Sequence, residues 1–238
     1  MVCPKEIILI GGGSSIREGL ALNLKEKLEG KCGFTLNFSF RHFNSTAEIA
    51  IDESFYRGFI LGNGITKDQS HVDALKELPF IIAPKLDFVR FYENTITLPF
   101  SDTYHKDPLK RGFYIGEKAL CGIFALHIAS WIASPDTSIY LLGFDGGALE
   151  GQDTHYYSDI KHKGMGLTNI YEVFDTEKSY KNFISKDIAK IYNVSPYSNL
   201  HCFEKIDYST FFTLLSDDKY DQTELRQYIR EKLTWKKE

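Results

Sequence analysis

Apolar residues occur in short runs that alternate with stretches of helical periodicity along most of the chain. The first apolar run covers residues 7–10 and ends at three glycines and two serines. An amphipathic stretch follows and predicts a helix that continues to about Glu29. The order therefore indicates a strand, a glycine turn and the start of a helix. Ser14 or Ser15 can cap the first N–H groups of that helix.

The same alternation continues through the rest of the chain, and it predicts one α/β domain over residues 1–238. Because strands and helices alternate, the sheet is expected to be mainly parallel, with helices on both faces. The further predicted strands cover residues 34–40, 56–61, 80–83, 95–98 and 138–142, with strand-like pieces at 193–195 and 201–203. The further predicted helices cover residues 44–53, 69–78, 116–133, 176–192 and 222–233.

Two segments lack this regular pattern. Residues 85–111 are aromatic and irregular around the short strand at 95–98, and they could form an insertion beside a binding pocket. Residues 148–168 are polar, rich in glycine and in titratable side chains, and longer than a simple connector. A functional loop is therefore expected at 148–168.

Glycine-rich corners at residues 11–13, 62–64 and 143–147 each follow a predicted strand. Ligands of open parallel sheets bind at the carboxyl ends of strands, so these corners are expected to meet at one site. Glycine lets a ligand approach bare backbone, and a helix that begins after the first corner attracts anions. The first hypothesis is a nucleotide or phosphate pocket. The alternative is a tight turn between strand and helix that binds nothing.

Composition and charge limit the partners that can be expected. A chain of 238 residues with 43% apolar content can bury a sizeable core as a single globular domain. The net charge of −4 argues against nonspecific binding to nucleic acid. Lys161, His162 and Lys163 form a basic cluster that is interpreted as solvated surface.

Cysteine usage and hydropathy indicate a cytoplasmic protein. No apolar stretch approaches the 18 residues of a membrane span, and the N-terminus lacks the apolar region of a signal peptide. The cysteines are scattered, without the spacing of a zinc site, and reduced thiols are the simplest interpretation. They are Cys3, Cys32, Cys121 and Cys202.

The glycine turn departs from two well-known nucleotide motifs. A dinucleotide site needs a third glycine where Ile16 stands and an acidic residue at the end of the second strand, where Ser39-Phe40-Arg41 stand. A hydride-transferring oxidoreductase is therefore disfavoured. The chain also lacks G-x-x-x-x-G-K-[ST], so ATP hydrolysis of the P-loop type is disfavoured as well.

Two titratable residues are candidates for chemistry. Asp145 follows the strand at 138–142 and could bind a sugar hydroxyl or a metal, although an Asp at this position also commonly caps its own turn. His155 lies in the polar loop, and an imidazole that titrates near neutral pH suits the deprotonation of a hydroxyl. A loop histidine is also commonly just solvated, and His162 is a competing candidate. His127, inside the apolar helix, is expected to pack in the core.

Four short motifs occur in order along the chain: Ile7-Ile8-Leu9-Ile10-Gly11-Gly12-Gly13-Ser14-Ser15-Ile16, Cys121-Gly122, Ile139-Tyr140-Leu141-Leu142-Gly143-Phe144-Asp145, and Thr154-His155-Tyr156-Tyr157. This order resembles the bacterial family-42 sialyltransferases. It is also similar to 6-hydroxymethylpterin diphosphokinase-like domains and to phage proteins of this size. The late segment at 193–200 resembles the Cys/Ser-Pro-x-Ser-x-Leu segment of these families.

The resemblance implies a Rossmann-like, GT-A-related fold that transfers a sugar from a nucleotide donor, most simply of the CMP type, to a hydroxyl acceptor. Neither a metal nor a further cofactor is implied. His155 would act as general base, with Asp145 beside it in the catalytic site. The residues around the nucleotide would be Gly11, Gly12, Gly13, Ser14, Ser15, Asn63, Cys121, Gly122, Gly143, Phe144 and Asp145.

Several positions differ from the family pattern, and they keep two other functions open. Gly12 stands where Asn is expected, Ser14 where Pro is expected and Cys121 where Ser is expected, and no tyrosine directly follows Asp145. These differences remove side-chain contacts to a donor. One alternative is a nucleotide-binding or interaction protein without catalysis. The other is a Mg²⁺-dependent, diphosphokinase-like phosphoryl transfer that uses Asp145, Asp153 and Asp159.

Overall fold

The computed structural model describes residues 3–52, 55, 69–85, 93–116, 120–147, 155–157, 176–184 and 189–234. The strands of the main sheet are β1 (Glu6–Ile10), β2 (Gly33–Leu36), β3 (Ala47–Ile49), β4 (Ile81–Pro84), β5 (Thr95–Leu98), β8 (Ser138–Leu142), β9 (Lys190–Asn193) and β10 (Glu204–Lys205). A separate pair consists of β6 (Phe100–Ser101) and β7 (Phe113–Tyr114). The helices are α1 (Ile16–Ala21), α2 (Leu24–Lys27), η1 (Asn37–Arg41), α4 (Gln69–Glu77), α5 (Pro108–Arg111), α6 (Cys121–Ile132), α7 (Thr176–Tyr180), η4 (Lys181–Phe183), α8 (Tyr208–Leu214) and α9 (Gln222–Leu233).

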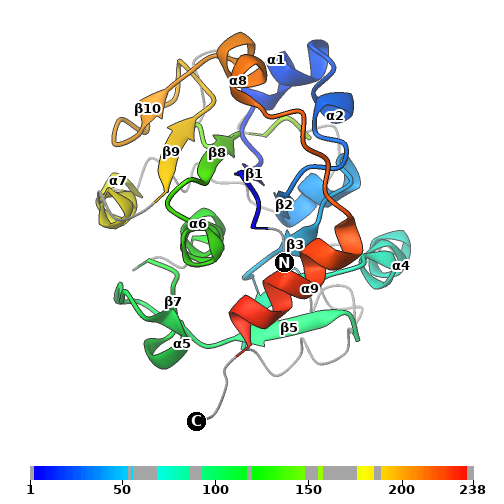
Figure 1. Ribbon diagram of the computed structural model, residues 1–238, viewed down its shortest axis with the longest axis vertical. Helices are drawn as coiled ribbons and strands as arrows, with labels where there is room; N and C mark the ends of the chain where they lie inside the picture. Colours follow the sequence, from blue (N-terminus) through cyan, green and yellow to red (C-terminus); the bar gives the residue numbers. More distant parts are fainter. Residues whose placement is uncertain are drawn as a thin grey trace.

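The main sheet has eight strands in the order β10-β9-β8-β1-β2-β3-β4-β5, and every recorded pair of neighbours is parallel. The chain winds outward from β1 through β2 to β5 on one side, and from β8 through β9 to β10 on the other (Figure 1). The strand order therefore reverses between β1 and β8, which pair from Glu6 opposite Ser138 to Ile10 opposite Leu142. This is a Rossmann-like α/β fold, and its topological switch point lies at the ends of these two strands.

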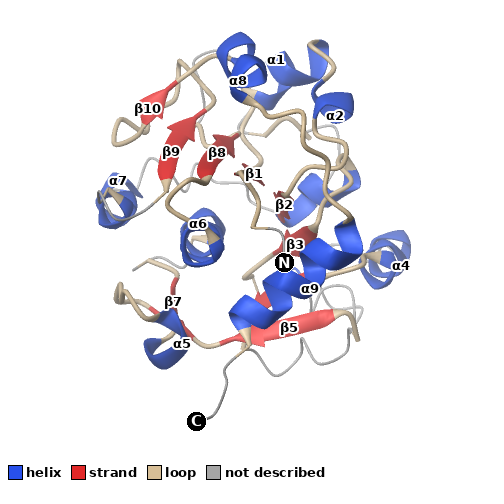
Figure 2. Ribbon diagram, viewed as in Figure 1, coloured by secondary structure: helices blue, strands red, loops and turns tan. Residues whose placement is uncertain are grey.

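Helices cover both faces of the sheet, as Figure 2 shows. Ile7 and Leu9 of β1 pack in one core with residues of α6 and α9, whereas Ile8 and Ile10 pack in a second core with residues of α1, α4 and α8. All five residues of β1 are buried, because consecutive side chains point into opposite cores. The expected three-layer arrangement is confirmed.

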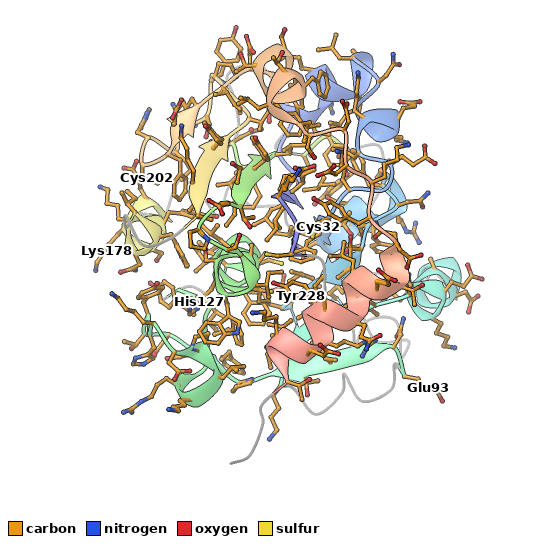
Figure 3. All side chains as sticks on the ribbon, viewed as in Figure 1. Cys32, Glu93, His127, Lys178, Cys202 and Tyr228 are labelled. Atoms are coloured by element: carbon orange, nitrogen blue, oxygen red, sulfur yellow. The ribbon has the colours of Figure 1, made fainter. Side chains whose placement is uncertain are left out.

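The apolar helix is central, as expected, and it contains the predicted core histidine. His127 is 3% exposed, and its Nδ1 accepts a 2.7 Å hydrogen bond from the N–H of Tyr114. Burial lowers the pKa of this imidazole to about 4, so the side chain is neutral at pH 7. Figure 3 labels His127, which is a residue of α6. The helix begins at Cys121 rather than 116, and Gly116 has a left-handed φ of 74°.

The predicted helix that continues to Glu29 is wrong in its length. The chain forms α1, breaks, and then forms the single turn of α2. Asn23 lies at the break with a φ of 60°, a left-handed conformation that ends a right-handed helix. The helical spacing of apolar residues nevertheless holds across the break, because Ile16 of α1 and Leu24 of α2 both pack in the second core.

Two predictions after β2 are also corrected. The strand predicted at 34–40 ends at Leu36, because Asn37 has a φ of 54° and the chain enters η1. Phe38 and Phe40 nevertheless both reach the second core, so their alternating spacing imitated a strand. The short helix predicted at 44–53 is instead strand β3, in which Glu48 separates two buried apolar residues.

Other predictions stand as follows. The elements predicted at 69–78, 80–83, 95–98, 138–142 and 222–233 are confirmed within a residue or so. The helix predicted at 176–192 is wrong beyond Phe183, since Lys190–Asn193 form strand β9. The predicted strand at 56–61 and the glycines at 62 and 64 lie outside the described residues. None of the helices in the described part of the chain is long and apolar enough to span a membrane.

Candidate functional site

The glycine turn after β1 packs directly against the end of β8, at the switch point of the sheet. The N–H of Gly11 donates to the carbonyl of Leu142 at 2.7 Å, and the N–H of Gly13 donates to the carbonyl of Gly143 at 2.9 Å. A Cβ on Gly13 would lie 2.6 Å from that Gly143 oxygen and 2.5 Å from Oδ2 of Asp145. The glycine at 13 is therefore required for the close approach of the two strand ends.

Asp145 reaches from the end of β8 to the first turn of α1 and is 3% exposed. Its Oδ2 accepts the N–H of Ser15 at 3.0 Å and its Oδ1 accepts the Ser15 hydroxyl at 2.5 Å. Burial raises the pKa of this carboxyl, and the hydrogen bonds from Ser15 oppose that shift. The chain's own carboxyl thus lies where an external anion was expected at the helix start.

This contact corrects the predicted role of the two serines. Ser15 is the residue before α1, but its hydroxyl makes no capping hydrogen bond to the helix because it donates to Asp145. Ser14 Oγ is buried and has no hydrogen-bond partner among the described residues. The expected serine cap is therefore wrong, and the carboxyl of Asp145 performs that role from another strand.

Further buried polar atoms without partners surround Asp145. Within the described ranges, Asn193 Oδ1 has no hydrogen-bond partner, and the hydroxyls of Ser14 and Ser195 make no hydrogen bond of ordinary geometry. These two hydroxyls nevertheless act on the Asp145 carboxyl as weak donors and lower its pKa. Buried polar atoms are nearly always paired with protein, ordered water or a ligand. This end of the sheet therefore keeps hydrogen-bonding capacity that the described residues do not fully use.

The turn after β9 braces the same corner. Asn193 Nδ2 and Ser198 Oγ donate to the carbonyl of Phe144 at 3.1 Å and 2.7 Å, and the N–H of Asn199 donates to the carbonyl of Asp145 at 2.7 Å. The Ser-Pro-x-Ser segment therefore has a clear structural role. It fixes the backbone of Phe144 and Asp145 from the neighbouring strand.

His155 lies on the glycine turn. The next residue, Tyr156, donates its N–H to the carbonyl of Gly12 at 3.0 Å, and Arg17 Nη2 donates to the carbonyl of His155 at 3.3 Å. A Cβ on Gly12 would lie 2.5 Å from Tyr157 Oη and 2.6 Å from Cδ2 of His155. Gly12 therefore gives room to residues 155–157, and the predicted base lies beside the first glycine corner.

The start of α6 completes one side of the site. Cys121 Sγ donates to the carbonyl of Ile49 at 3.3 Å, and burial raises the pKa of its thiol well above the usual value, so the thiol is neutral. A Cβ on Gly122 would lie 2.8 Å from the ring of Phe144 and 2.6 Å from Tyr180 Oη. Gly122 thus adjoins the Gly143–Asp145 corner, whereas Cys121 lies at the end of β3. Asn63 lies outside the described residues.

Several residues of the site were not predicted from the sequence. Ser39 Oγ donates to the carbonyl of Gly11 at 2.8 Å, although residue 39 was assigned to a strand. The Tyr157 ring packs against the ring of His155, and the ring of His42 lies nearly parallel to that of Tyr157. Arg17 could have been noticed as a cation in the first turn of a helix that follows a glycine corner.

The described residues contain neither a cluster of metal ligands nor a disulfide. Across the ranges that the structure describes, no three His, Cys, Asp or Glu side chains come together as metal ligands. Asp153, Asp159 and the basic cluster at 161–163 lie outside those ranges. The four cysteines are free, as the scattered spacing predicted, and Figure 3 labels Cys32 and Cys202 in separate parts of the molecule.

The chain matches no protein-family model, no curated protein and no solved structure. The class of protein is therefore defined by the fold and the site alone. It is a Rossmann-like α/β protein. At its switch point the glycine turn, the Gly143–Asp145 corner and residues 155–157 meet.

Proposed function

We propose that the chain is a nucleotide-sugar-dependent glycosyltransferase that acts at this switch point, with a donor of the CMP type and an acceptor that carries a hydroxyl. One observation carries the proposal. Residues 155–157 lie on Gly12, so the imidazole of His155 adjoins the corner where Rossmann-like folds bind nucleotides. The buried polar atoms near Asp145 that make no hydrogen bond of ordinary geometry among the described residues support a polar ligand there.

In the proposed reaction, His155 accepts the proton of the acceptor hydroxyl. The acceptor oxygen forms a bond to the anomeric carbon as the bond from that carbon to the donor phosphate breaks. The nucleotide leaves with the electron pair on its phosphate. Arg17 contributes positive charge on the leaving-group side. It is exposed in the first turn of α1, and its guanidinium donates a hydrogen bond to the carbonyl of His155.

Asp145 has a supporting role in this proposal. Both of its carboxyl oxygens accept hydrogen bonds from Ser15, and its backbone carbonyl accepts the N–H of Asn199. We therefore assign Asp145 to holding α1 against β8. The nucleotide then contacts the glycine backbone and the hydroxyls around this brace, which include Ser14 and Ser195.

A thermal-shift screen with CMP, CDP, UDP, GDP and ATP, each with and without Mg²⁺, tests the nucleotide class. A ligand at a hundredfold excess over its Kd stabilises a protein by about 2.7 kcal/mol, which is roughly 5–11 °C in Tm at this chain length. The proposal predicts a shift with CMP or CDP that does not depend on Mg²⁺. A shift only with ATP and Mg²⁺ would favour phosphoryl transfer instead, and no shift with any nucleotide would contradict the nucleotide site.

The role of His155 is tested with His155→Gln and a donor that the wild type turns over. General-base catalysis contributes roughly 10²- to 10⁴-fold, so kcat should fall by that factor while the nucleotide-induced Tm shift is retained. His201→Gln, an exposed histidine after β9, is the matched control and should keep the wild-type rate. Full turnover by His155→Gln would remove His155 from the mechanism. A retained nucleotide shift without turnover of any donor would favour a binding protein.

A further inference from the structure

Tyr157 is buried among four other rings beside the glycine turn. Its ring centroid lies 5.0 Å from that of His155, with a tilt of 35°, and 6.4 Å from that of His42, with the planes 13° apart. Phe38 and Tyr156 meet the same ring edge-on at 6.0 Å and 4.9 Å. We call these five residues the Tyr157 cluster. Because neighbours surround the Tyr157 ring on several sides, its position is fixed by packing.

The Tyr157 cluster also rests on the glycine turn. Tyr157 Oη lies only 2.5 Å from the position of a Cβ on Gly12, and Cδ2 of His155 lies 2.6 Å from it. The hydrogen bond from the Tyr156 N–H to the carbonyl of Gly12 fixes the backbone between the two rings. The position of the His155 ring is thus set from three directions, by the Tyr157 ring, by Gly12 and by its own backbone.

We propose that Tyr157 is the positioning residue for His155, an inference that rests on the proposed transferase function. Tyr157 is 5% exposed, so it acts through His155 rather than through contact with a ligand. A general base works only within a narrow range of position, and a displacement of about 1 Å costs on the order of 100-fold in rate. The His42 ring also packs against Tyr157, nearly parallel to it, and a side chain at position 12 would displace the rings of Tyr157 and His155.

The test uses protein labelled with ¹³C and ¹⁵N in histidine, so that the His155 imidazole is observed directly by NMR. Tyr157→Ala should remove the ring-current shift of the His155 Hδ2 and Hε1 signals and lower kcat on the order of 100-fold. It should leave KM for the nucleotide donor nearly unchanged. Tyr157→Phe retains the ring and should restore the His155 signals and most of the lost rate. Phe100→Ala, at an exposed aromatic on β6, is the control.

If Tyr157→Ala does not fold, a second variant, Gly12→Ala, tests the same proposal. Gly12→Ala introduces the Cβ that would meet Tyr157 Oη and His155 Cδ2, so it should shift the same His155 signals in a protein that keeps Tyr157. Tyr157→Phe removes the 2.5 Å contact, so Gly12→Ala in that background should shift the signals less. Unchanged His155 signals in both Tyr157→Ala and Gly12→Ala would overturn the proposal.

The two proposals fail in different ways. The NMR measurement needs no substrate, so it reports on the position of His155 even if no nucleotide binds. Displaced His155 signals with an unchanged kcat would mean that Tyr157 positions His155 but that His155 is not the base. That result would refute the role of Tyr157 in catalysis as well as the proposed mechanism, and it would leave the packing description intact.

Discussion

A buried carboxyl group lies at each end of the central strands, Glu6 at the amino end of β1 and Asp145 after the carboxyl end of β8. The two groups differ in the charges and hydrogen bonds that surround them. At the amino end, Glu6 pairs with Lys31 at 3.0 Å, and the Ser216 hydroxyl donates to both Glu6 oxygens. Lys31 also donates to the carbonyls of Ser216 and Asp218. At the carboxyl end, the described donors to Asp145 are neutral, chiefly the N–H and hydroxyl of Ser15, and buried oxygens that make no hydrogen bond of ordinary geometry within the described residues lie around it.

The difference separates a structural site from a candidate functional one. At the amino end, Glu6 and Lys31 pair with each other and with further hydrogen-bond partners among the described residues, so these two buried charges need no ligand. At the carboxyl end Ser14, Asn193 and Ser195 retain polar atoms without described partners. Such unpaired atoms are costly, and proteins tolerate them where function requires them.

The largest effect is expected at the amino end. Lys31→Met leaves Glu6 buried without its cation, which costs about 3–5 kcal/mol of unfolding free energy in comparable buried pairs. Urea unfolding measures this loss. Lys5→Met is the matched control, because the Lys5 ion pair with Asp218 is exposed and should leave the unfolding midpoint nearly unchanged. Equal midpoints for the two variants would contradict a structural lock at this end.

An intermediate effect is expected at Glu48 on β3, between the two ends. The side chain is 0% exposed, and neither carboxyl oxygen makes a hydrogen bond of ordinary geometry among the described residues, although the nearby Thr35 hydroxyl acts as a weak donor. Unpaired buried polar groups cost about 1–3 kcal/mol, so Glu48→Met should be more stable than the wild type by that amount at pH 7. Chemical unfolding at pH 7 measures the difference.

The stability gain of Glu48→Met should depend on pH. Burial raises the pKa of Glu48 well above the usual value of about 4.5 for this side chain, so the folded protein holds a proton that the unfolded chain releases above that pH. Wild-type stability should therefore fall as pH rises above about 4.5, and the advantage of Glu48→Met should shrink as pH falls toward that value. Glu26→Met, at an exposed position in α2, is the control. A gain that did not change with pH would contradict an ionisation effect at Glu48.

The smallest effect is expected at Ser15. Ser15→Ala removes the hydroxyl that donates to Asp145 Oδ1 but keeps the backbone N–H bond to Oδ2. A loss of about 1 kcal/mol is expected, since one hydrogen bond of two is removed. Hydrogen exchange should show faster opening of α1 in this variant than in Ser209→Ala, an exposed position in α8. Equal exchange in both would mean that Asp145 does not hold α1.

Much of the fold was accessible from sequence because burial on both faces imposes continuous apolar runs. The strand at 138–142 and the helix at 222–233 were predicted with the observed bounds, and the latter is capped by Asp221 as such patterns indicate. Two of the errors arose where one residue changed the backbone. Asn23 and Asn37 adopt positive φ, and neither is a glycine or a proline. Helix α8 was missed although Asp207 caps it by accepting the N–H of Thr210.

The candidate site was predictable only in part, because long-range contacts build it. The glycine corners and His155 could be chosen from residue type and position. The bond between Ser15 and Asp145 could not be, because each residue had a plausible local role as a cap or turn former. Nor could the ring contacts of Tyr157 with His42, since ring packing between distant segments leaves no periodic pattern.

The central claim is that the carboxyl end of the sheet binds a nucleotide, whereas the amino end is structural. The most direct test is an amide NMR titration of the ¹⁵N-labelled full chain with CMP. The account predicts shifts at the amides of Gly11, Gly13, Gly143 and Asp145, and unchanged signals at Glu6 and Lys31. Shifts concentrated at the amino end, or no shift at either end with CMP in large excess, would contradict the claim.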